Sequence, residues 1–284
     1  MSTSKPLQEA GAVNVKTLGI GLGTLLWVNV KPLWNRLARG EGQLLLVNLS
    51  IVLFARPDAA TMVVASVLSA AVLALLYGLN DVYDCERDRN DPAKDQVLAS
   101  FCAAHRRRLL GILQVEKVAL VLLAMLLLGS RSALALAALF LVNLAYSAVL
   151  KGKAGLDVLW VGLWGGLYAM VPGVALPIAV VLLVGVMTSI CHIFQILRDR
   201  EADDRNDIHT SAVASRWLPF AQLGIACAAM GILLGSLLGP LAGFSAVAPL
   251  ALRILLSENQ SAWLASKAYY AVVWILVLLA VHGG

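Results

Sequence analysis

The sequence has few charged residues, which make up 14% of its 284 positions, against about 25% in soluble domains. Apolar types take their place, and the residues AVILMFWYC account for 60% of the chain. A soluble fold could not bury so much apolar surface, so a water-soluble enzyme is excluded. A disordered chain is excluded as well, because disorder requires low hydrophobicity. The composition therefore predicts an integral membrane protein.

Cysteine is equally scarce. The four cysteines, Cys85, Cys102, Cys191 and Cys227, show no CxxC or metal-ligand spacing, which excludes a disulfide-rich secreted fold and predicts small core residues. A small-residue cleavage site is also missing after the apolar stretch Thr17–Val30. The sequence therefore predicts no cleavable signal peptide.

Long apolar runs are abundant, and a membrane-spanning helix needs about 20 mostly apolar residues. Nine runs approach this length: 41–56, 59–80, 109–129, 132–150, 157–176, 177–197, 217–237, 240–256 and 265–282. The shorter, glycine-containing stretch 17–30 predicts an interfacial segment or part of an entering helix. We expect an all-α bundle of nine transmembrane helices around a central cavity. Residues 1–40 would form an N-terminal cytoplasmic or interfacial segment, and residues 41–284 the transmembrane domain.

The positive charges follow this topology. With nine crossings, 20 of the 22 Lys and Arg residues fall on one side, and only Arg56 and Arg131 fall on the other. The positive-inside rule then places the N-terminus and the charged loops in the cytoplasm and the C-terminus outside. The net charge of +5 is explained by this topology, so no nucleic-acid partner is predicted.

The acidic residues are concentrated in two places. Of the 17 Asp and Glu residues, 11 lie in the stretches 81–95 and 199–207. Each stretch follows the cytoplasmic end of an apolar segment, the second and the sixth, and these two segments run in the same direction. If the helices continue, Asp81, Asp84 and Asp88 share one face, and Asp199 and Asp203 share another.

Stacked carboxylates repel one another unless a cation lies between them. Hard oxygen ligands favour Mg²⁺ or Ca²⁺, and Mg²⁺ in proteins commonly joins one or two carboxylates to substrate phosphate oxygens. Two facing clusters therefore predict a metal-bridged diphosphate at the membrane surface. The alternative interpretation is that these acids are solvated loop residues balanced by neighbouring arginines.

Both motifs resemble those of the UbiA superfamily of intramembrane prenyltransferases. An NDxxDxxxD motif follows the second helix of that family, and a DxxxD motif follows the sixth. The present chain has Asn80-Asp81-x-x-Asp84-x-x-x-Asp88 and Asp199-x-x-x-Asp203. Further similarities are Tyr146-Ser147 before Lys151, Leu156-Asp157-Val158, and Thr210-Ser211-Ala212-Val213.

The resemblance implies a fold and an activity. The acids of both motifs would bind Mg²⁺ and the diphosphate of an isoprenyl donor, and a lipophilic or aromatic acceptor would attack the allylic cation in a cavity open to membrane lipids. It implies catalytic roles for Asp84, Asp199 and Lys151, and metal binding by all five motif aspartates. The expected substrate-binding residues are Asn80, Lys94, Tyr146, Arg198 and Tyr77.

Aromatic side chains near the acids are further candidates, because their ring faces attract cations. They are Tyr77, Tyr83, Tyr146 and Tyr168. For each of them a core or interfacial position is the alternative interpretation. His192 lies in an apolar segment, and we expect a hydrogen-bonded packing residue there rather than an acid or base.

The stretch Asp91-Pro92-Ala93-Lys94 departs from the commonest pattern of the family and resembles members that act on acceptors other than quinone precursors. Asp207 stands where a glycine is usual. The acceptor therefore stays open, and so does an alternative reaction, phosphoribosyl transfer from 5-phosphoribosyl diphosphate to a polyprenyl phosphate. If the protein is not an enzyme, the alternatives are a transporter or channel and a structural subunit that docks a cytosolic partner.

Overall fold

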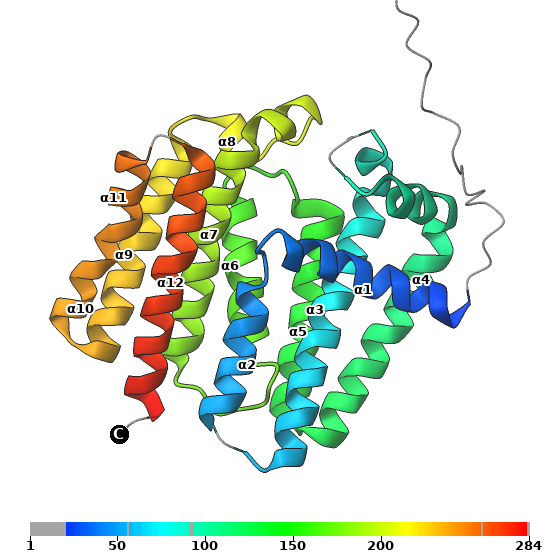
Figure 1. Ribbon diagram of the computed structural model, residues 1–284, viewed down its shortest axis with the longest axis horizontal. Coiled ribbons are helices and arrows are strands. Elements are labelled where there is room, and N and C mark those ends of the chain that lie inside the picture. The colour runs from blue at the N-terminus through cyan, green and yellow to red at the C-terminus, as the bar shows by residue number, and fades with distance from the viewer. Residues whose placement is uncertain (1–20, 56, 91–93, 257, 283–284) are drawn as a thin grey trace, which may run out of the picture.

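The computed structural model describes residues 21–55, 57–90, 94–256 and 258–282, and within these ranges it contains helices and no strand (Figure 1). The all-α prediction is confirmed. The α-helices are α1 (Leu22–Ala38), α2 (Gln43–Ala55), α3 (Ala59–Asp88), α4 (Gln96–Leu127), α5 (Ser130–Ala145), α6 (Leu156–Ala169), α7 (Ile178–Arg205), α8 (Ser211–Ala214), α9 (Leu218–Leu238), α10 (Pro240–Phe244), α11 (Ala248–Leu255) and α12 (Asn259–His282). A π-helical turn, η2 (Tyr146–Leu150), extends α5, and the 3₁₀ turn η3 (Ser245–Val247) joins α10 to α11.

Each predicted apolar segment contains at least one of these helices, and six helices are long and apolar enough to cross a membrane. They are α3, α4, α5 with η2, α7, α9 and α12. The helices of the other three segments, α2, α6 and the stretch from α10 to α11, are shorter. The helices therefore agree with the predicted integral membrane protein, while the count of nine crossings stays a prediction.

The first helix crosses the end of the bundle. The axis of α1 makes an angle of 96° with that of α2, so the chain turns sharply at residues 39–42. In Figure 1, α1 lies across the bundle beside α3 and α4. The apolar stretch 17–30 thus contributes to α1, although residues 17–20 lie outside the described residues.

Glycines bring α6 and α7 together. A Cβ atom on Gly162 would lie 2.1 Å from Ser189 Oγ, and one on Gly185 would lie 2.9 Å from the Gly162 carbonyl oxygen. Small residues at such a crossing let two helix backbones approach closely, which is a common packing mode in membranes. This crossing fixes the position of α7, which carries the second acid motif.

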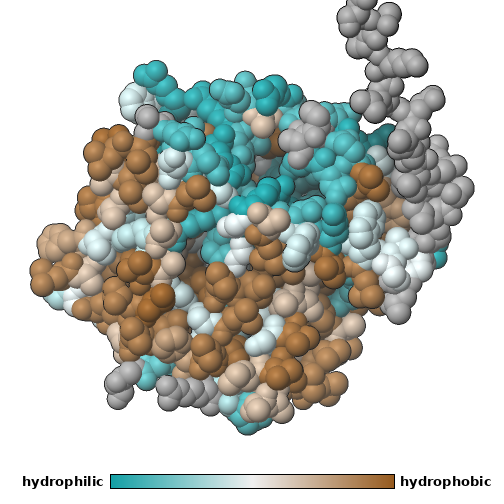
Figure 2. Space-filling view, viewed as in Figure 1, coloured by the Kyte–Doolittle hydropathy of each residue, from teal (hydrophilic) through white to brown (hydrophobic). Residues whose placement is uncertain are grey.

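Polar residues gather at one end of the bundle. Figure 2 shows hydrophilic side chains at the end of the bundle where α7 ends and where α8 and the start of α4 lie, and hydrophobic ones over most of the remaining visible surface. Helices α3 and α7 run in the same direction and both end at this polar end (Figure 1). The predicted parallel orientation of the two motif-bearing helices is confirmed. The four cysteines are free and buried, which confirms their predicted role in the core.

Candidate active site

The first acid motif lies on the last turns of α3. Its helix continues past the apolar run to Asp88, so Asp81, Asp84 and Asp88 follow the helical spacing that the sequence predicted. Each of the three carboxylates has a basic partner, and these partners come from different parts of the chain. The motif is therefore held by contacts from α1, from the loop after η2 and from Lys94, just before α4.

Asp84 is the most buried acid of this motif, and it pairs with Lys151. Their side chains are 8% and 22% exposed, and Lys151 Nζ donates to Asp84 Oδ2. Lys151 also donates to Asn80 Oδ1 at 3.4 Å, and Arg87 lies 3.5 Å from the other oxygen of Asp84. Asn80, Asp84 and Lys151, all predicted site residues, are thus brought together. In this arrangement Asn80 helps to hold the lysine.

The π-turn η2 positions Lys151. The backbone amide of Lys151 donates to the Tyr146 carbonyl at 2.8 Å, which is the i→i+5 bond of a π-helix. Residues five apart in an α-helix lie about 140° from each other around the axis, whereas the wider π-turn brings them closer to one side. Such turns occur frequently at functional sites. Tyr146 and Lys151 are therefore joined by one hydrogen-bonded turn.

Asp81 is paired with a residue that the sequence analysis did not propose. The Arg36 guanidinium on α1 donates to both carboxylate oxygens of Asp81, at 2.7 and 3.3 Å. Its Cζ atom also lies 4.3 Å from the ring centroid of Tyr77. Tyr77, predicted to bind substrate, thus lies beside Asp81 through this arginine. Sequence reasoning missed Arg36, because no local pattern connects positions 45 residues apart.

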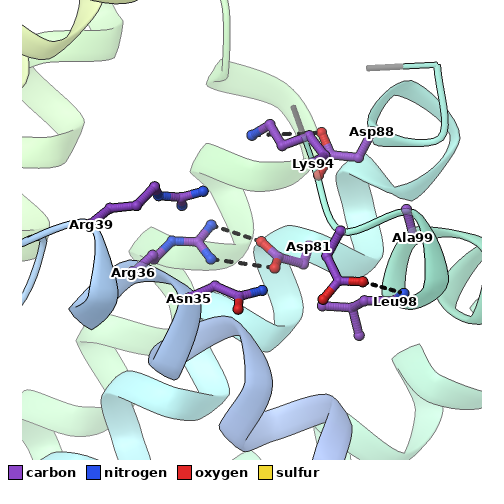
Figure 3. Close-up of a pocket in the computed structure, with 9 residues that line it drawn as sticks. Asn35, Arg36, Arg39, Asp81, Asp88, Lys94, Leu98 and Ala99 are labelled. Carbon is purple, nitrogen blue, oxygen red and sulfur yellow. Dashed lines mark hydrogen bonds and ion pairs between the residues drawn. The ribbon is translucent and has the colours of Figure 1, made fainter. Parts of the chain in front are cut away.

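A pocket opens beside this pair. Figure 3 shows Arg36 of α1 and Arg39, which directly follows that helix, facing Asp81 and Asp88 of α3, with Lys94 alongside. Lys94 Nζ lies 3.9 Å from Asp88 Oδ1, so these two predicted site residues lie close together. The remaining lining residues are Asn35, Asp95, Leu98 and Ala99. Basic and acidic groups alternate around the pocket, a setting in which an anion and a cation can bind together.

The second acid motif lies at the end of α7, where the helix continues to Arg205. Asp199 is paired with its neighbour, since Arg198 donates to its two oxygens at 2.7 and 2.9 Å. The Arg198 guanidinium also lies 4.1 Å from the ring centroid of Trp263 on α12. Lys267 Nζ lies 3.1 Å from the same centroid, so the buried Trp263 contacts two cations.

Asp203 lies one turn beyond Asp199 and accepts from the Thr210 hydroxyl at 3.4 Å. Lys151, which contacts Asp84 of the first motif, also acts electrostatically on Asp203 of the second. The structure places both motifs at the same end of the bundle (Figure 1).

The predicted Mg²⁺ site can be judged here from its donor atoms. Among the described residues, no three His, Cys, Asp or Glu side chains form a ready-made metal cluster. The donor set nevertheless fits Mg²⁺, because five carboxylates of hard oxygen lie on two helices and Mg²⁺ needs only one or two of them beside substrate phosphates. Asp81, Asp84, Asp88, Asp199 and Asp203 remain the proposed metal ligands.

Aromatic rings continue inward from the acids. The ring centroids of Tyr77 and Trp164 are 6.3 Å apart, and those of Trp164 and Tyr168 are 6.1 Å apart with nearly parallel planes. The Tyr168 hydroxyl donates to the Ser69 carbonyl at 2.8 Å, so that residue belongs to the packed core. Trp164, which the sequence analysis did not propose, links the two tyrosines.

His192 lies on the same helix as Asp199, and the expected packing role is only partly met. Its Nε2 atom is buried and lacks a hydrogen-bond partner within the part of the chain that the structure describes. The side chain is also within electrostatic range of Asp157, Asp199 and Lys151. The expectation of a hydrogen-bonded histidine is therefore not met at this nitrogen.

No protein-family model and no curated protein matches the chain. Solved structures do match. A UbiA homolog from Archaeoglobus fulgidus bound to DMAPP and Mg²⁺ has a TM-score of 0.62 and 16% identity, over 89% of this chain and 98% of that one. The homolog bound to GPP and Mg²⁺ has a TM-score of 0.59 at the same identity, over 89% and 99%. The Cd²⁺-bound form has a TM-score of 0.58.

These similarities extend along nearly the whole length of both chains, so they concern the bundle as a whole. At 16% identity they establish a shared fold. The chain therefore has the fold of the UbiA homologs, and the resemblance predicted from the two motifs is confirmed at that level.

Proposed function

We propose that this chain is a UbiA-superfamily prenyltransferase that transfers an isoprenyl group from an isoprenyl diphosphate to a lipophilic or aromatic acceptor, with Mg²⁺. The observation that carries the proposal is the convergence of two acid motifs and Lys151 at one end of an apolar bundle. The homologs of the same fold, whose structures were solved with DMAPP or GPP and Mg²⁺, support it.

The donor diphosphate would lie between α3 and α7. Magnesium ion, when bound, offsets the charge of the leaving diphosphate. Lys151, Arg198 and Lys94 would donate to the diphosphate oxygens, because each of these cations already lies against an acid of a motif. Asn80 and Asp84 both accept from the Lys151 ammonium group, which holds this cation against the first motif.

Transfer breaks the bond between C1 of the donor and the diphosphate oxygen, and the electron pair leaves with the diphosphate. The acceptor then bonds to C1 and gives up a proton. The allylic cation formed in between must be kept from water, and an apolar, water-poor site provides that protection. Tyr77 and Trp164 lie on the inner side of the acids, where their ring faces would stabilise the cation.

The position of the site at the polar end of the bundle indicates where the reaction would take place. A long isoprenyl chain dissolves in the membrane, while its diphosphate needs the polar end of the bundle (Figure 2). We propose that this end faces the cytoplasm, with the N-terminus inside and the C-terminus outside, because the positive charges are concentrated on that side.

The other candidate functions gain less support. Phosphoribosyl transfer stays open because of the unusual stretch 91–94, and residues 91–93 of that stretch lie outside the described residues. A transporter would need ionisable groups along a path through the bundle, whereas the motif acids lie together at its end and four of the five are ion-paired. A structural subunit would not require two acid motifs to lie at the same end of the bundle, with Lys151 paired to one of them.

The direct test is release of diphosphate by the purified protein in nanodiscs. We expect release from dimethylallyl or geranyl diphosphate with Mg²⁺ and a suitable acceptor, and no release with EDTA. Because the acceptor is open, mass spectrometry of lipids from cells with and without the protein should reveal a prenylated product. Absence of both diphosphate release and a new lipid would contradict the proposed function.

A further inference from the structure

A buried carboxylate outside the two motifs connects the segments that carry their partners. Asp157 begins the first turn of α6 and is 1% exposed. Among the described residues, no Lys, Arg or His forms an ion pair with it. Its charge is instead balanced by hydrogen bonds and by the N-terminal end of its own helix. An unpaired buried acid is costly unless each oxygen is satisfied, so its position calls for an explanation.

The hydrogen bonds of Asp157 reach across to another loop. One oxygen accepts from the Val158 amide at 2.9 Å and from the Ser211 hydroxyl at 2.5 Å, and the other accepts from the Ser211 amide at 2.8 Å. The Ser211 hydroxyl in turn accepts from the Gly155 amide at 2.9 Å. The start of α6 and the start of α8 are therefore tied by a closed set of hydrogen bonds.

The two loops also touch directly. Gly152 has a φ of +75°, and a Cβ atom there would lie 3.3 Å from Ile208 Cγ2 and 3.4 Å from the His209 nitrogen. A glycine is thus required both by the backbone conformation and by the close approach. The loop after η2 packs against the loop after α7 at this point, beside the hydrogen bonds of Asp157.

Each loop carries one part of the candidate active site. Lys151, in the loop after η2, pairs with Asp84. Thr210, in the loop after α7, donates to Asp203. A tie between these loops therefore fixes the distance between the cation of the first motif and an acid of the second.

We propose that Asp157, through Ser211, is a positioning residue that locks these two loops together and so sets the spacing between Lys151 and Asp203. A carboxylate suits this role because both of its oxygens accept, and three donors surround it. An asparagine would offer one accepting oxygen and place an NH₂ group against a donor. The inference rests on the proposed function for its catalytic consequence and on geometry alone for the lock itself.

The contact between the two loops can be tested by a measurement that does not depend on enzyme activity. Ala154 and His209 are exposed, one on each loop, and the four native cysteines are buried, so cysteines at 154 and 209 can be spin-labelled selectively. We expect a narrow distance distribution by pulsed electron paramagnetic resonance in the otherwise unchanged protein. Asp157→Asn and Ser211→Ala should each broaden it, and an unchanged distribution in both variants would overturn the lock.

To test the effect of the lock on catalysis, Ser211→Ala needs a control variant that destabilises the fold to a similar extent. Ser132 provides one, because it is also fully buried and its hydroxyl donates across to the Val171 carbonyl at 2.5 Å. Near the start of α5, Ser132 lies at the opposite end of the bundle (Figure 1). Ser132→Ala and Ser211→Ala thus each remove a buried hydroxyl contact between segments.

We expect Ser211→Ala and Asp157→Asn to raise the KM for the Mg²⁺–donor complex about 10-fold, the lower end of the range for residues that orient ligands, with a smaller change in kcat. Ser132→Ala should leave KM unchanged at a similar loss of melting temperature. Equal KM values in all variants would overturn the positioning role. Absence of turnover in the unmodified protein would contradict the proposed function, and the label distances would still decide the lock.

Discussion

The two acid motifs lie at the same end of the bundle, but they are stabilised in different ways. On α3, Asp81, Asp84 and Asp88 are paired with Arg36, Lys151 and Lys94, each from another segment. On α7, Asp199 is paired with its own neighbour, Arg198, and Asp203 contacts only a hydroxyl among the described side chains. The first motif is therefore part of the tertiary structure, whereas the second depends little on distant partners.

The difference also appears in exposure. The Asp84 side chain is 8% exposed and the Asp199 side chain is 36% exposed. Removing a buried charge leaves its partner unsatisfied, while removing an exposed one costs little stability. We infer that substitutions in the two motifs should separate stability from activity, although both motifs serve the same proposed reaction.

Removal of divalent metal should have the largest effect, because both motifs are proposed to act through it. EDTA is expected to abolish diphosphate release from an allylic diphosphate, and excess Mg²⁺ should restore it. EDTA already saturated with Mg²⁺ is the matched control. Release that persists in metal-free buffer would show that neither motif needs the ion.

Asp84→Asn and Asp199→Asn should each lower kcat/KM by about 100-fold or more, as loss of a group that stabilises developing charge does. Only the first should lower the melting temperature, because it leaves Lys151 without its buried partner. Kinetics and thermal unfolding on the same preparations test this contrast. Equal melting temperatures in the two variants would show that the motifs do not differ in structural role.

Lys151→Met should lower kcat/KM by about 10- to 100-fold, since it removes a cation proposed to bind the diphosphate and leaves Asp84 buried beside Arg87 alone. Lys153→Met is the control, because Lys153 lies on the same loop with an exposed side chain. We expect the control variant to keep its activity within about twofold, a change of under 0.5 kcal/mol. A comparable loss in both variants would assign the effect to the loop rather than to the ammonium group.

Arg36→Gln should have the smallest effect. Unlike the other variants, it should strengthen the binding of Mg²⁺. Arg36 occupies both oxygens of Asp81, so a metal ion must displace it there. The Mg²⁺ concentration for half-maximal activity should fall about threefold, equivalent to about 0.7 kcal/mol, a value within the range for partly exposed ion pairs. Arg107→Gln, on an exposed position of α4, is the matched control. An unchanged or higher Mg²⁺ requirement would show that Arg36 does not compete with metal.

Much of this arrangement could be predicted from the sequence. The apolar runs predicted the order of the helices, and the spacing of the acids predicted their helical faces, because both signals are local. The contacts of Arg36 with Asp81 and of Asp157 with Ser211 could not be predicted in the same way. Each joins residues far apart in the chain, and their positions depend on how the helices pack.

The ends of the helices show the same limit. Apolar runs indicated segments that stop near residues 80 and 197, whereas α3 and α7 continue to Asp88 and Arg205. The extra turns are polar, so hydropathy alone could not detect them. The sequence analysis could only state which acids would share a face if the helices continued, and the structure shows that both helices do continue. The π-turn η2 gave no sequence signal, since its hydrogen bonding depends on the loop that follows.

The most direct test of the central claim is to locate a bound metal ion in a crystal structure. Crystals grown with Mn²⁺ in place of Mg²⁺ and with inorganic diphosphate would reveal the ion by its anomalous scattering. The account predicts a peak between α3 and α7, ligated by at least one carboxylate from each motif and by diphosphate oxygens. A peak bound by only one motif, or an ion bound elsewhere in the chain, would contradict it.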